Sequence, residues 1–227
     1  KMGTILRPER QFQQVGAEII GSESYKADVE IINLAYKTLK KIGVKNIVIE
    51  ITAPFFLDSL FKKITNKDLK NKLKKYIKLK DINNCLKLLK KNELYNSFKT
   101  LHLCSGSIQN KKKYISKLNK IIGYENEVER LVKIANLIKT SKNDSLNVDF
   151  FDLQKNKNYY KGIKFTFFAK DVRGEIAGGG RYNLKYGSNS DKQYWYICPR
   201  YWSLIKNTSL TEEEVNSGKY GNVIPQS

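Results

Sequence analysis

The sequence predicts an α+β fold, in which a mostly antiparallel β-sheet is flanked by helices. Two observations support this fold class: apolar residues recur at helical spacing in some segments and alternate with polar residues in others. A third is the turn-forming segment Asp171–Gly174, which joins two alternating segments as the turn of a hairpin does. With 227 residues, the chain is long enough to bury a core against such a sheet.

The first quarter of the chain predicts a strand, a helix and a second strand. We expect the first strand to end near Ile20, and a helix to start within Gly21–Ser24 and end at Gly43. The apolar positions of this helix are Ala27, Ile31, Leu34, Ala35, Leu39 and Ile42. Residues 47–51 form the next predicted strand, which ends at Thr52–Pro54 because proline cannot continue a strand ladder.

Residues 55–119 form a lysine-rich segment that we expect to be a helical insertion between two parts of a core, residues 1–54 and 120–186. Apolar residues recur in it at intervals of three and four, which predicts a set of short amphipathic helices. A basic helical block can bind nucleic acid or a membrane surface. The alternative, which we favour, is that the lysines are solvated faces around an apolar seam.

The second half of the chain predicts one helix and three strands. The helix lies near residues 128–138, and a strand at residues 146–150 follows it. Another strand at residues 163–168 turns back at Asp171–Gly174, so that Glu175–Tyr182 returns as its antiparallel partner. Both tryptophans of the protein fall within Tyr194–Trp202, and this change of character predicts a tail of different origin over residues 187–227.

Composition weakens several classes of function. The net charge of +20 would suit a nucleic-acid binder, but only six of the 42 basic residues are arginines, the residue that nucleic-acid readers usually enlist. His102 is the sole histidine, and the three cysteines are widely spaced, so neither a zinc site nor a Ser-His-Asp triad is easily assembled. The sequence has no apolar run of about 18 residues, and its first residues lack the apolar core typical of a signal peptide. We therefore expect a cytoplasmic protein without a membrane anchor, metal or cofactor.

Distant segments suggest two sides of one small-molecule pocket. The segments are Arg10–Glu18 on one side, and Tyr159–Gly162 with Gly178–Tyr182 on the other. In a strand, alternation would point Gln14 and Glu18 to one face with Gly16 between them. A carboxylate that faces a core needs a cation as partner. Two alternatives stay open: Glu18 is a surface charge on an exposed strand, or the glycines mark a bulge or bend.

In their order and context, these segments resemble the histidyl-tRNA synthetase fold. More closely, Ile5–Phe12 and Tyr159–Phe165 resemble the regulatory subunit of the two-component ATP phosphoribosyltransferase, a paralogue of the synthetase. The resemblance covers about residues 3–186. It implies a class II aminoacyl-tRNA synthetase-like fold of the histidyl type, with a helical insertion.

The resemblance also implies a histidine pocket. Its residues would be Gln14, Glu18, Tyr159, Tyr160, Gly179, Gly180 and Tyr182. Glu18 would pair with the α-ammonium of histidine, Gln14 would bond its polar groups, and the tyrosine hydroxyls would orient the imidazole. Arg7 and Arg10 match the loop that handles ATP in a synthetase, and we expect them to be remnants of it.

Departures from the synthetase pattern favour a regulatory role. Synthetases precede the tyrosine pair with Arg-Gly-Leu-Asp, whereas this chain has Lys155–Asn158, and lysine lacks the planar fork of arginine. The family's glycine-rich ATP-binding signature is also missing after Tyr186. We therefore expect a non-catalytic subunit that binds histidine for feedback control of the first step of histidine biosynthesis. Its expected partner is a short-form catalytic phosphoribosyltransferase subunit, with a homodimer of this chain in the hetero-oligomer.

Two other functions remain as alternatives, an aminoacylating histidyl-tRNA synthetase fragment and a basic nucleic-acid-binding module. The chain begins inside the arginine-bearing loop of the family, so we expect it to be a fragment. The tail resembles, through Cys198–Trp202, a segment of proteins from large DNA viruses, which suggests a chimeric junction near residues 186–188.

Overall fold

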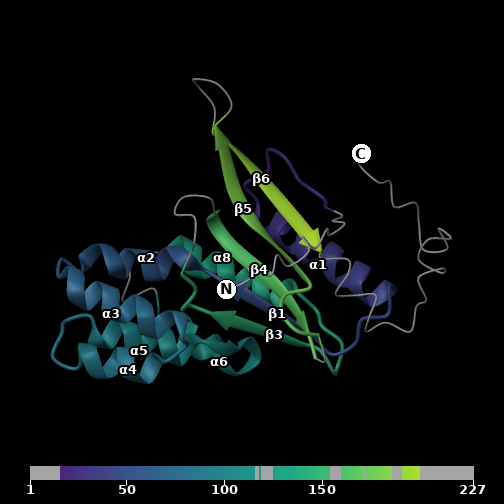
Figure 1. Cartoon of the computed structure of the whole chain (residues 1–227). Helices are drawn as coiled ribbons and strands as arrows, with labels where there is room; N and C mark the ends of the chain where they lie inside the picture. The colour runs from purple at the N-terminus through teal and green to yellow at the C-terminus, as the bar shows by residue number, and fades with distance from the viewer. Residues whose placement is uncertain are drawn as a thin grey trace, which may run out of the picture.

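The computed structural model describes residues 16–115, 118, 125–153, 160–170, 172–185 and 191–199. The described residues form one six-stranded sheet with helices packed against it (Figure 1). Its strands lie in the order β2-β3-β1-β4-β5-β6, and β1 and β3 are parallel while the other neighbours are antiparallel. The predicted α+β class with a mostly antiparallel sheet is therefore confirmed. The strands are β1 (Ile47–Thr52), β2 (Gly106–Ser107), β3 (Ser145–Asp149), β4 (Tyr160–Ala169), β5 (Ala177–Lys185) and β6 (Asp191–Pro199).

The helices lie toward opposite ends of the sheet, with α2 to α6 gathered at one end and α1 near β5 and β6 at the other (Figure 1). The described helices are α1 (Tyr25–Lys41), α2 (Pro54–Lys63), α3 (Lys67–Lys78), α4 (Ile82–Leu89), α5 (Tyr95–Cys104), α6 (Ile108–Ile115) and α8 (Glu125–Leu137). Helix α1 begins where the sequence predicted, because the Ser24 side chain accepts a hydrogen bond from the Lys26 N–H at 3.2 Å. It ends just before Gly43, whose φ of +90° suits glycine.

The core lies on the face of the sheet that carries the apolar side chains of β1 and β4. Ile47, Ile49 and Ile51 are fully buried, as are Phe165 and Phe167 on the neighbouring strand. Apolar side chains of α1 and α8 belong to the same buried cluster. Helices therefore cover this side of the sheet among the described residues.

Asp144 joins α1 to the sheet. Its buried carboxylate accepts hydrogen bonds from the Tyr36 hydroxyl at 2.7 Å, the Ile47 N–H at 2.7 Å and the Lys40 ammonium at 3.1 Å. Burial alone would raise the pKa of Asp144, but these donors outweigh burial and lower it. Asp144 thus remains a carboxylate that fixes the edge of the core.

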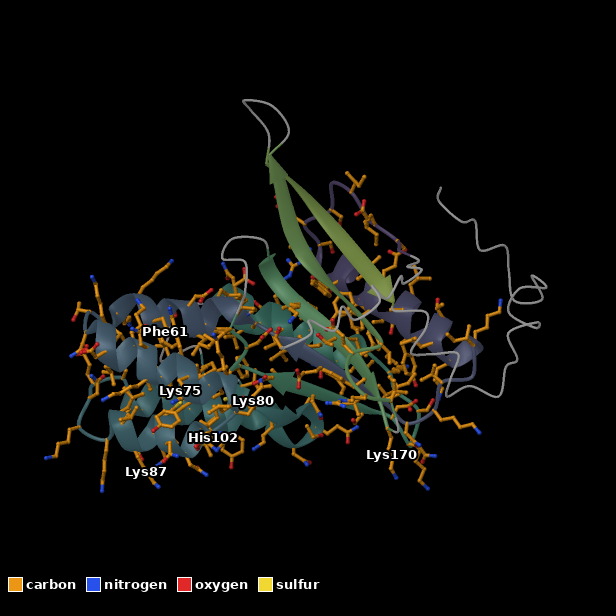
Figure 2. All side chains as sticks on the ribbon, in the orientation of Figure 1. Phe61, Lys75, Lys80, Lys87, His102 and Lys170 are labelled. Carbon is orange, nitrogen blue, oxygen red and sulfur yellow. The ribbon has the colours of Figure 1, made fainter. Side chains whose placement is uncertain are left out.

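The helical insertion, which we define as α2 to α6, confirms the predicted set of amphipathic helices. Its apolar residues, such as Phe61, Leu73 and Phe98, are buried and belong to the same cluster as the core of the sheet. Its lysines lie on the outside, where Lys75 and Lys87 are exposed (Figure 2). The division of the chain into a core and an insertion remains a prediction.

Two segments differ from the sequence-based expectations. Within the strand expected to end near Ile20, the described residues 16–19 have no regular structure and Ile20 makes a single β-bridge, while residues 10–15 lie outside the described part. In the predicted tail, residues 191–199 form β6 and pair with β5 along their length. This pairing adds a sixth strand at the edge of the sheet. The different origin of the tail remains a prediction.

Candidate functional site

The face of the sheet opposite the helix-covered core carries polar side chains. Glu50 on β1 pairs with Thr166 on β4, and Thr52 pairs with Lys164. Directly paired residues of neighbouring strands project to the same face. These four side chains therefore share one side of the sheet, which we call the polar face; Thr52 and Thr166 are buried there, and Glu50 and Lys164 are partly exposed.

Glycines extend the polar face onto β5. Gly180 pairs with Lys164, and Gly178 pairs with Thr166. Neither has a side chain, so a ligand or backbone can approach closely beside Lys164. Gly179 is buried and, by alternation, lies toward the helix-covered side, opposite Phe165. The polar face thus combines charged side chains with two positions on β5 that carry no side chain, of which Gly178 is half-buried and Gly180 is buried.

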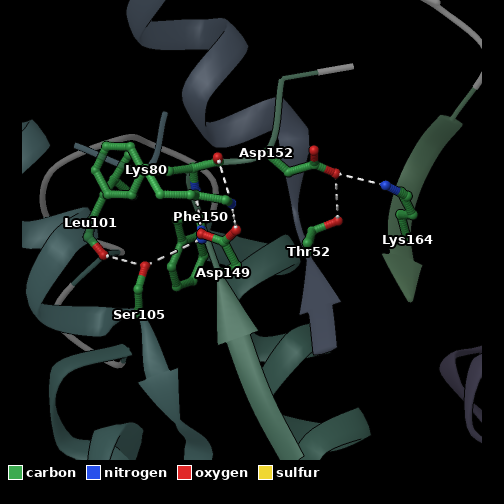
Figure 3. A network of polar contacts seen from close by, with 9 residues as sticks. Thr52, Lys80, Leu101, Ser105, Asp149, Phe150, Asp152 and Lys164 are labelled. Atoms are coloured by element: carbon green, nitrogen blue, oxygen red, sulfur yellow. Dashed lines mark hydrogen bonds and ion pairs between the residues drawn. The ribbon is translucent and has the colours of Figure 1, made fainter. Parts of the chain in front are cut away.

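Asp152 and Lys164 form an ion pair at the edge of the polar face. The Lys164 ammonium lies 2.9 Å from the Asp152 carboxylate, and the Thr52 hydroxyl donates to the same oxygen at 3.4 Å (Figure 3). Both charged side chains are about one-quarter exposed, which leaves them accessible to a ligand. The pair presents an acceptor and a donor side by side, as recognition of an amino acid requires.

Glu50 lies beside this pair. Burial raises the pKa of the Glu50 carboxyl, and the negative charge of Asp149 adds to the effect. The nearby Lys80 and Lys164 oppose it. A carboxyl that holds its proton more firmly than usual can donate as well as accept a hydrogen bond.

Two of the sequence motifs, Tyr159–Gly162 and Gly178–Tyr182, meet at Arg181. A Cβ atom at Gly162 would lie 3.2 Å from both Cβ and Cδ of Arg181, so the glycine lets the arginine side chain cross over β4. The Arg181 guanidinium donates at 3.1 Å to the carbonyl of Ser24, four residues beyond Ile20. The register of β4 against β5 shifts between Tyr160 and Lys164, whereas Gly178, Gly179 and Gly180 pair with β4 in regular register, so the bulge or bend considered for these three glycines is not seen there.

Arg181 also belongs to a buried charge cluster that fixes the start of α1. The carboxylate of Asp28 is fully buried and accepts a hydrogen bond from the Nε of Arg130, on α8, at 3.0 Å. The Nη2 of Arg181 lies 3.5 Å from the same carboxylate oxygen. Arg130 also donates to the Glu23 carbonyl at 2.8 Å. The cluster therefore ties the segment that follows Glu18 to the strand that bears Gly180.

Burial dominates the electrostatics of this cluster. It raises the pKa of Asp28 to about 7, against the opposing effect of Arg130 and Arg181. It also lowers the pKa of Arg181 to about 10, which the charge of Asp28 opposes. One oxygen of Asp28, Oδ1, has no hydrogen-bond partner among the described residues. A buried carboxyl with an incomplete shell of donors is one that protonates easily.

The structure brings together the backbone positions of some predicted site residues. Tyr160 and Tyr182 are direct partners across β4 and β5, and Gly180 lies two residues before Tyr182. Glu18 is exposed, whereas Ala17 and Ile19 pack against the core, so exposure alternates as expected. The other predicted residues lie outside the part of the chain that the structure describes: Arg7, Arg10, Gln14, Lys155–Asn158 and Tyr159. The histidine pocket as a whole remains a prediction.

Sequence reasoning missed the residues that organise the site. It quoted Arg181 only as part of a motif, and it gave no role to Asp28, Arg130 or Lys80. A signal for Arg181 existed: alternation with Ala177 and Gly179 places it on the core side, where an arginine requires a buried carboxylate. Asp28 is one candidate, because it lies on the buried side of its helix with Ile31 and Ile32.

The described residues contain no group of three or more His, Cys, Asp or Glu side chains that could hold a metal ion. Burial raises the pKa of the Cys85 thiol to about 11 and that of Cys104 to about 12, so both stay protonated, as expected for reduced thiols. None of the described helices is long and apolar enough to cross a membrane.

The fold, with helices on one face of a mostly antiparallel sheet and polar side chains on the other, is that of a class II aminoacyl-tRNA synthetase-like domain. The family model described as histidyl-tRNA synthetase matches residues 2–193, and the chain belongs to that family. The recognised resemblance is therefore confirmed.

Curated relatives are named as regulatory subunits. The chain is 27% identical over 182 residues to an ATP phosphoribosyltransferase regulatory subunit of Rhodospirillum rubrum, covering 79% of this chain and 47% of the relative. It is 28% identical over 196 residues to the subunit of the same name from Clostridium acetobutylicum, covering 83% and 47%. The chain thus spans about half the length of the curated relatives it matches.

Solved structures confirm the fold. A structure described as an ATP phosphoribosyltransferase regulatory subunit/histidyl-tRNA synthetase from Bacillus halodurans matches with a TM-score of 0.68 at 19% identity, covering 88% of this chain and 54% of that one. Histidyl-tRNA synthetase from Nostoc sp. PCC 7120 matches with a TM-score of 0.63 at 18% identity, covering 95% and 53%. The ATP phosphoribosyl transferase (HisG:HisZ) complex from Thermotoga maritima contains a chain that matches with a TM-score of 0.63 at 15% identity, covering 83% and 66%.

Proposed function

We propose that the chain is a non-catalytic regulatory module that binds histidine on its polar face and acts on a catalytic ATP phosphoribosyltransferase subunit. The observation that supports this most is the partly exposed ion pair of Asp152 and Lys164 on the polar face, in a chain whose curated relatives are named as regulatory subunits. Histidine would lie beside Lys164, which pairs with Gly180 across β4 and β5.

The polar face offers groups of the kind that an amino-acid ligand needs. Asp152 and Lys164 would supply an acceptor and a donor for its charged ends. The exposed Glu18, in the segment before α1, would supply a second carboxylate in this proposal. The aligned positions of Tyr160 and Tyr182 place two aromatic residues at one end of the same strand pair. Gln14 and Tyr159 complete the proposed set, with Gly179 behind it.

The replacement at Lys155–Asn158 supports the proposed loss of catalysis. Activation of an amino acid by ATP requires stabilisation of a charged acyl phosphate, for which the planar fork of arginine is suited and the lysine point charge is not. In this proposal Arg7 and Arg10 are remnants of an ATP loop. The module would act within a hetero-oligomer that contains a homodimer of this chain.

The mechanism is a coupling between two sites. Histidine would bind one conformation of the module better than another, and that difference would lower the activity of the attached catalytic subunit. A typical coupling changes affinity by roughly 5- to 150-fold.

An assay of a short-form catalytic subunit with and without the chain tests this proposal. We expect histidine to inhibit phosphoribosyl transfer to ATP more strongly when the chain is present. Glu18→Ala should remove this difference, while Glu30→Ala, a change at an exposed carboxylate on α1, should keep it. Equal inhibition with and without the chain would reject the regulatory role.

ATP–pyrophosphate exchange separates this function from that of a synthetase. The chain should give no histidine-dependent exchange. Exchange above background would show that it activates histidine, which would make it a synthetase fragment. Binding of RNA that weakens steeply with salt would instead support the basic nucleic-acid-binding module.

A further inference from the structure

Lys80 occupies an unusual backbone position at the end of α3. Its φ is 57°, in the left-handed region. The Lys80 N–H donates to the Ile77 carbonyl and the Asp81 N–H to the Tyr76 carbonyl, each at 2.9 Å, which together form a Schellman motif. Glycine or asparagine is favoured at this position, because a Cβ atom crowds the backbone there. By contrast, Asn46, with a φ of 52°, is of a favoured type.

The Lys80 side chain reaches from the helical insertion to the end of β3. Its ammonium forms an ion pair with Asp149 and donates to the Phe151 carbonyl at 3.1 Å (Figure 3). The other oxygen of Asp149 accepts from the Phe151 N–H at 2.8 Å. Lys80 therefore closes the turn that β3 makes as it leaves the sheet.

A second residue of the insertion holds the same turn. The Ser105 hydroxyl accepts from the Phe150 N–H at 3.2 Å and donates to the Leu101 carbonyl at 3.0 Å. The Phe150 ring lies 5.5 Å from that of Phe56 on α2. The turn after β3 is thus attached to the insertion through its backbone, its charges and its rings.

The turn leads directly into the polar face. Asp152 follows Phe151, and it holds Lys164 beside Gly180. An exposed ion pair by itself contributes little to stability. Lys80 stands at a position where glycine is preferred, and backbone outliers of this kind are common at functional sites. Its conformation therefore points to a role in placing the turn.

We propose that Lys80 is a positioning residue that couples the helical insertion to the polar face. When the insertion shifts, the ammonium of Lys80 draws Asp149 with it, and the turn changes the placement of Asp152 and Lys164. Through this contact, occupancy of the polar face is linked to the position of the insertion. The consequence for histidine rests on the proposed function, whereas the mechanical coupling does not.

Amide hydrogen exchange of the chain without ligand tests the coupling. Lys80→Gly removes the ammonium and also relieves the backbone, so the fold should be kept. We expect exchange at the Phe150 and Phe151 amides to rise at least about tenfold, which is within the usual range for local opening. Lys80→Arg should restore exchange to within about twofold of the wild type, because it returns a cation. Lys78→Ala, at an exposed lysine of the same helical turn, should change neither amide.

Asp149→Asn removes the same ion pair from the side of the sheet. It should reproduce the rise in exchange, and the double variant with Lys80→Gly should show less than the sum of the two single effects, because both changes remove the same ion pair. Unchanged exchange in either single variant, or failure of arginine to restore it, would overturn the proposal.

A histidine titration then tests the link to the ligand. Lys80→Gly should weaken histidine binding by about fivefold or more, the lower end of usual coupling between sites. If the turn loosens but the affinity for histidine stays the same, the link between Lys80 and the histidine site is rejected. If the wild type binds no histidine, the proposed function fails, and hydrogen exchange still decides the mechanical coupling.

Discussion

Replacing Asp28 with asparagine should change how the stability of the protein depends on pH. Burial raises the pKa of Asp28 in the folded chain to about 7, from an ordinary value of 3.8. The folded state therefore holds a proton that the unfolded state releases more easily. The contribution of Asp28 to stability is fully present below the pKa of the unfolded chain. It is lost as the pH rises from that value through the folded pKa.

The size of the effect follows from the two pKa values. They differ by about three pH units, and one unit corresponds to about 1.4 kcal/mol, so the loss between pH 4 and pH 8 is roughly 4 kcal/mol. Asparagine does not titrate. The free energy of unfolding of the wild type minus that of Asp28→Asn should therefore fall by this amount over that range.

Urea unfolding followed by far-ultraviolet circular dichroism at pH 4, 5, 6, 7 and 8 would measure this difference. Asp144→Asn is a matched control, because Asp144 is also buried but its pKa is lowered by its donors. Its contribution is present above the unfolded pKa and is lost as pH falls. The difference between the wild type and Asp144→Asn should be flat from pH 5 to pH 8.

A flat or rising difference for Asp28→Asn would refute the reasoning. It would mean that Arg130 and Arg181 keep Asp28 ionised throughout, so that attraction to the two arginines outweighs burial. The cluster would then be a buried ion pair and its removal would be most damaging at neutral pH.

Two further variants test the contacts of Arg181. Arg181→Met should lower the free energy of unfolding by about 2–4 kcal/mol, because it removes the donors to the Ser24 carbonyl and Asp28, and a loss under about 0.5 kcal/mol in urea titrations would argue against the role of Arg181. Gly162→Ala should cost about 1–3 kcal/mol, because the new Cβ meets an arginine held at its far end, and a more stable alanine variant in thermal unfolding would contradict this contact.

The central elements of the fold were predictable because each has a local signal. Helix α1 follows from the capping residue Ser24 and regular apolar spacing, and β1, β4 and β5 follow from alternation. The parallel pairing of β1 with β3 was not predicted, since alternation identifies a strand but not its neighbour. Strand β6 was not predicted, because its aromatic residues coincide with a change in composition that also suits a separate tail.

The candidate site was predictable only in part, for a similar reason. Motifs indicated Tyr160, Gly180 and Tyr182, and the pairing of β4 with β5 brings their backbones together. The ion pairs of Asp28 and Lys80 join residues more than 60 positions apart, so no local pattern identifies them. Lys80 in particular is one lysine among many, and only its backbone conformation distinguishes it.

Isothermal titration calorimetry with histidine most directly tests whether the polar face is a histidine site. The wild type should bind histidine, and Glu18→Ala should weaken binding roughly 10- to 100-fold, as expected for the loss of a charged hydrogen bond. Glu30→Ala should bind as the wild type does. No binding by the wild type, or equal binding by Glu18→Ala, would contradict the assignment of the histidine site.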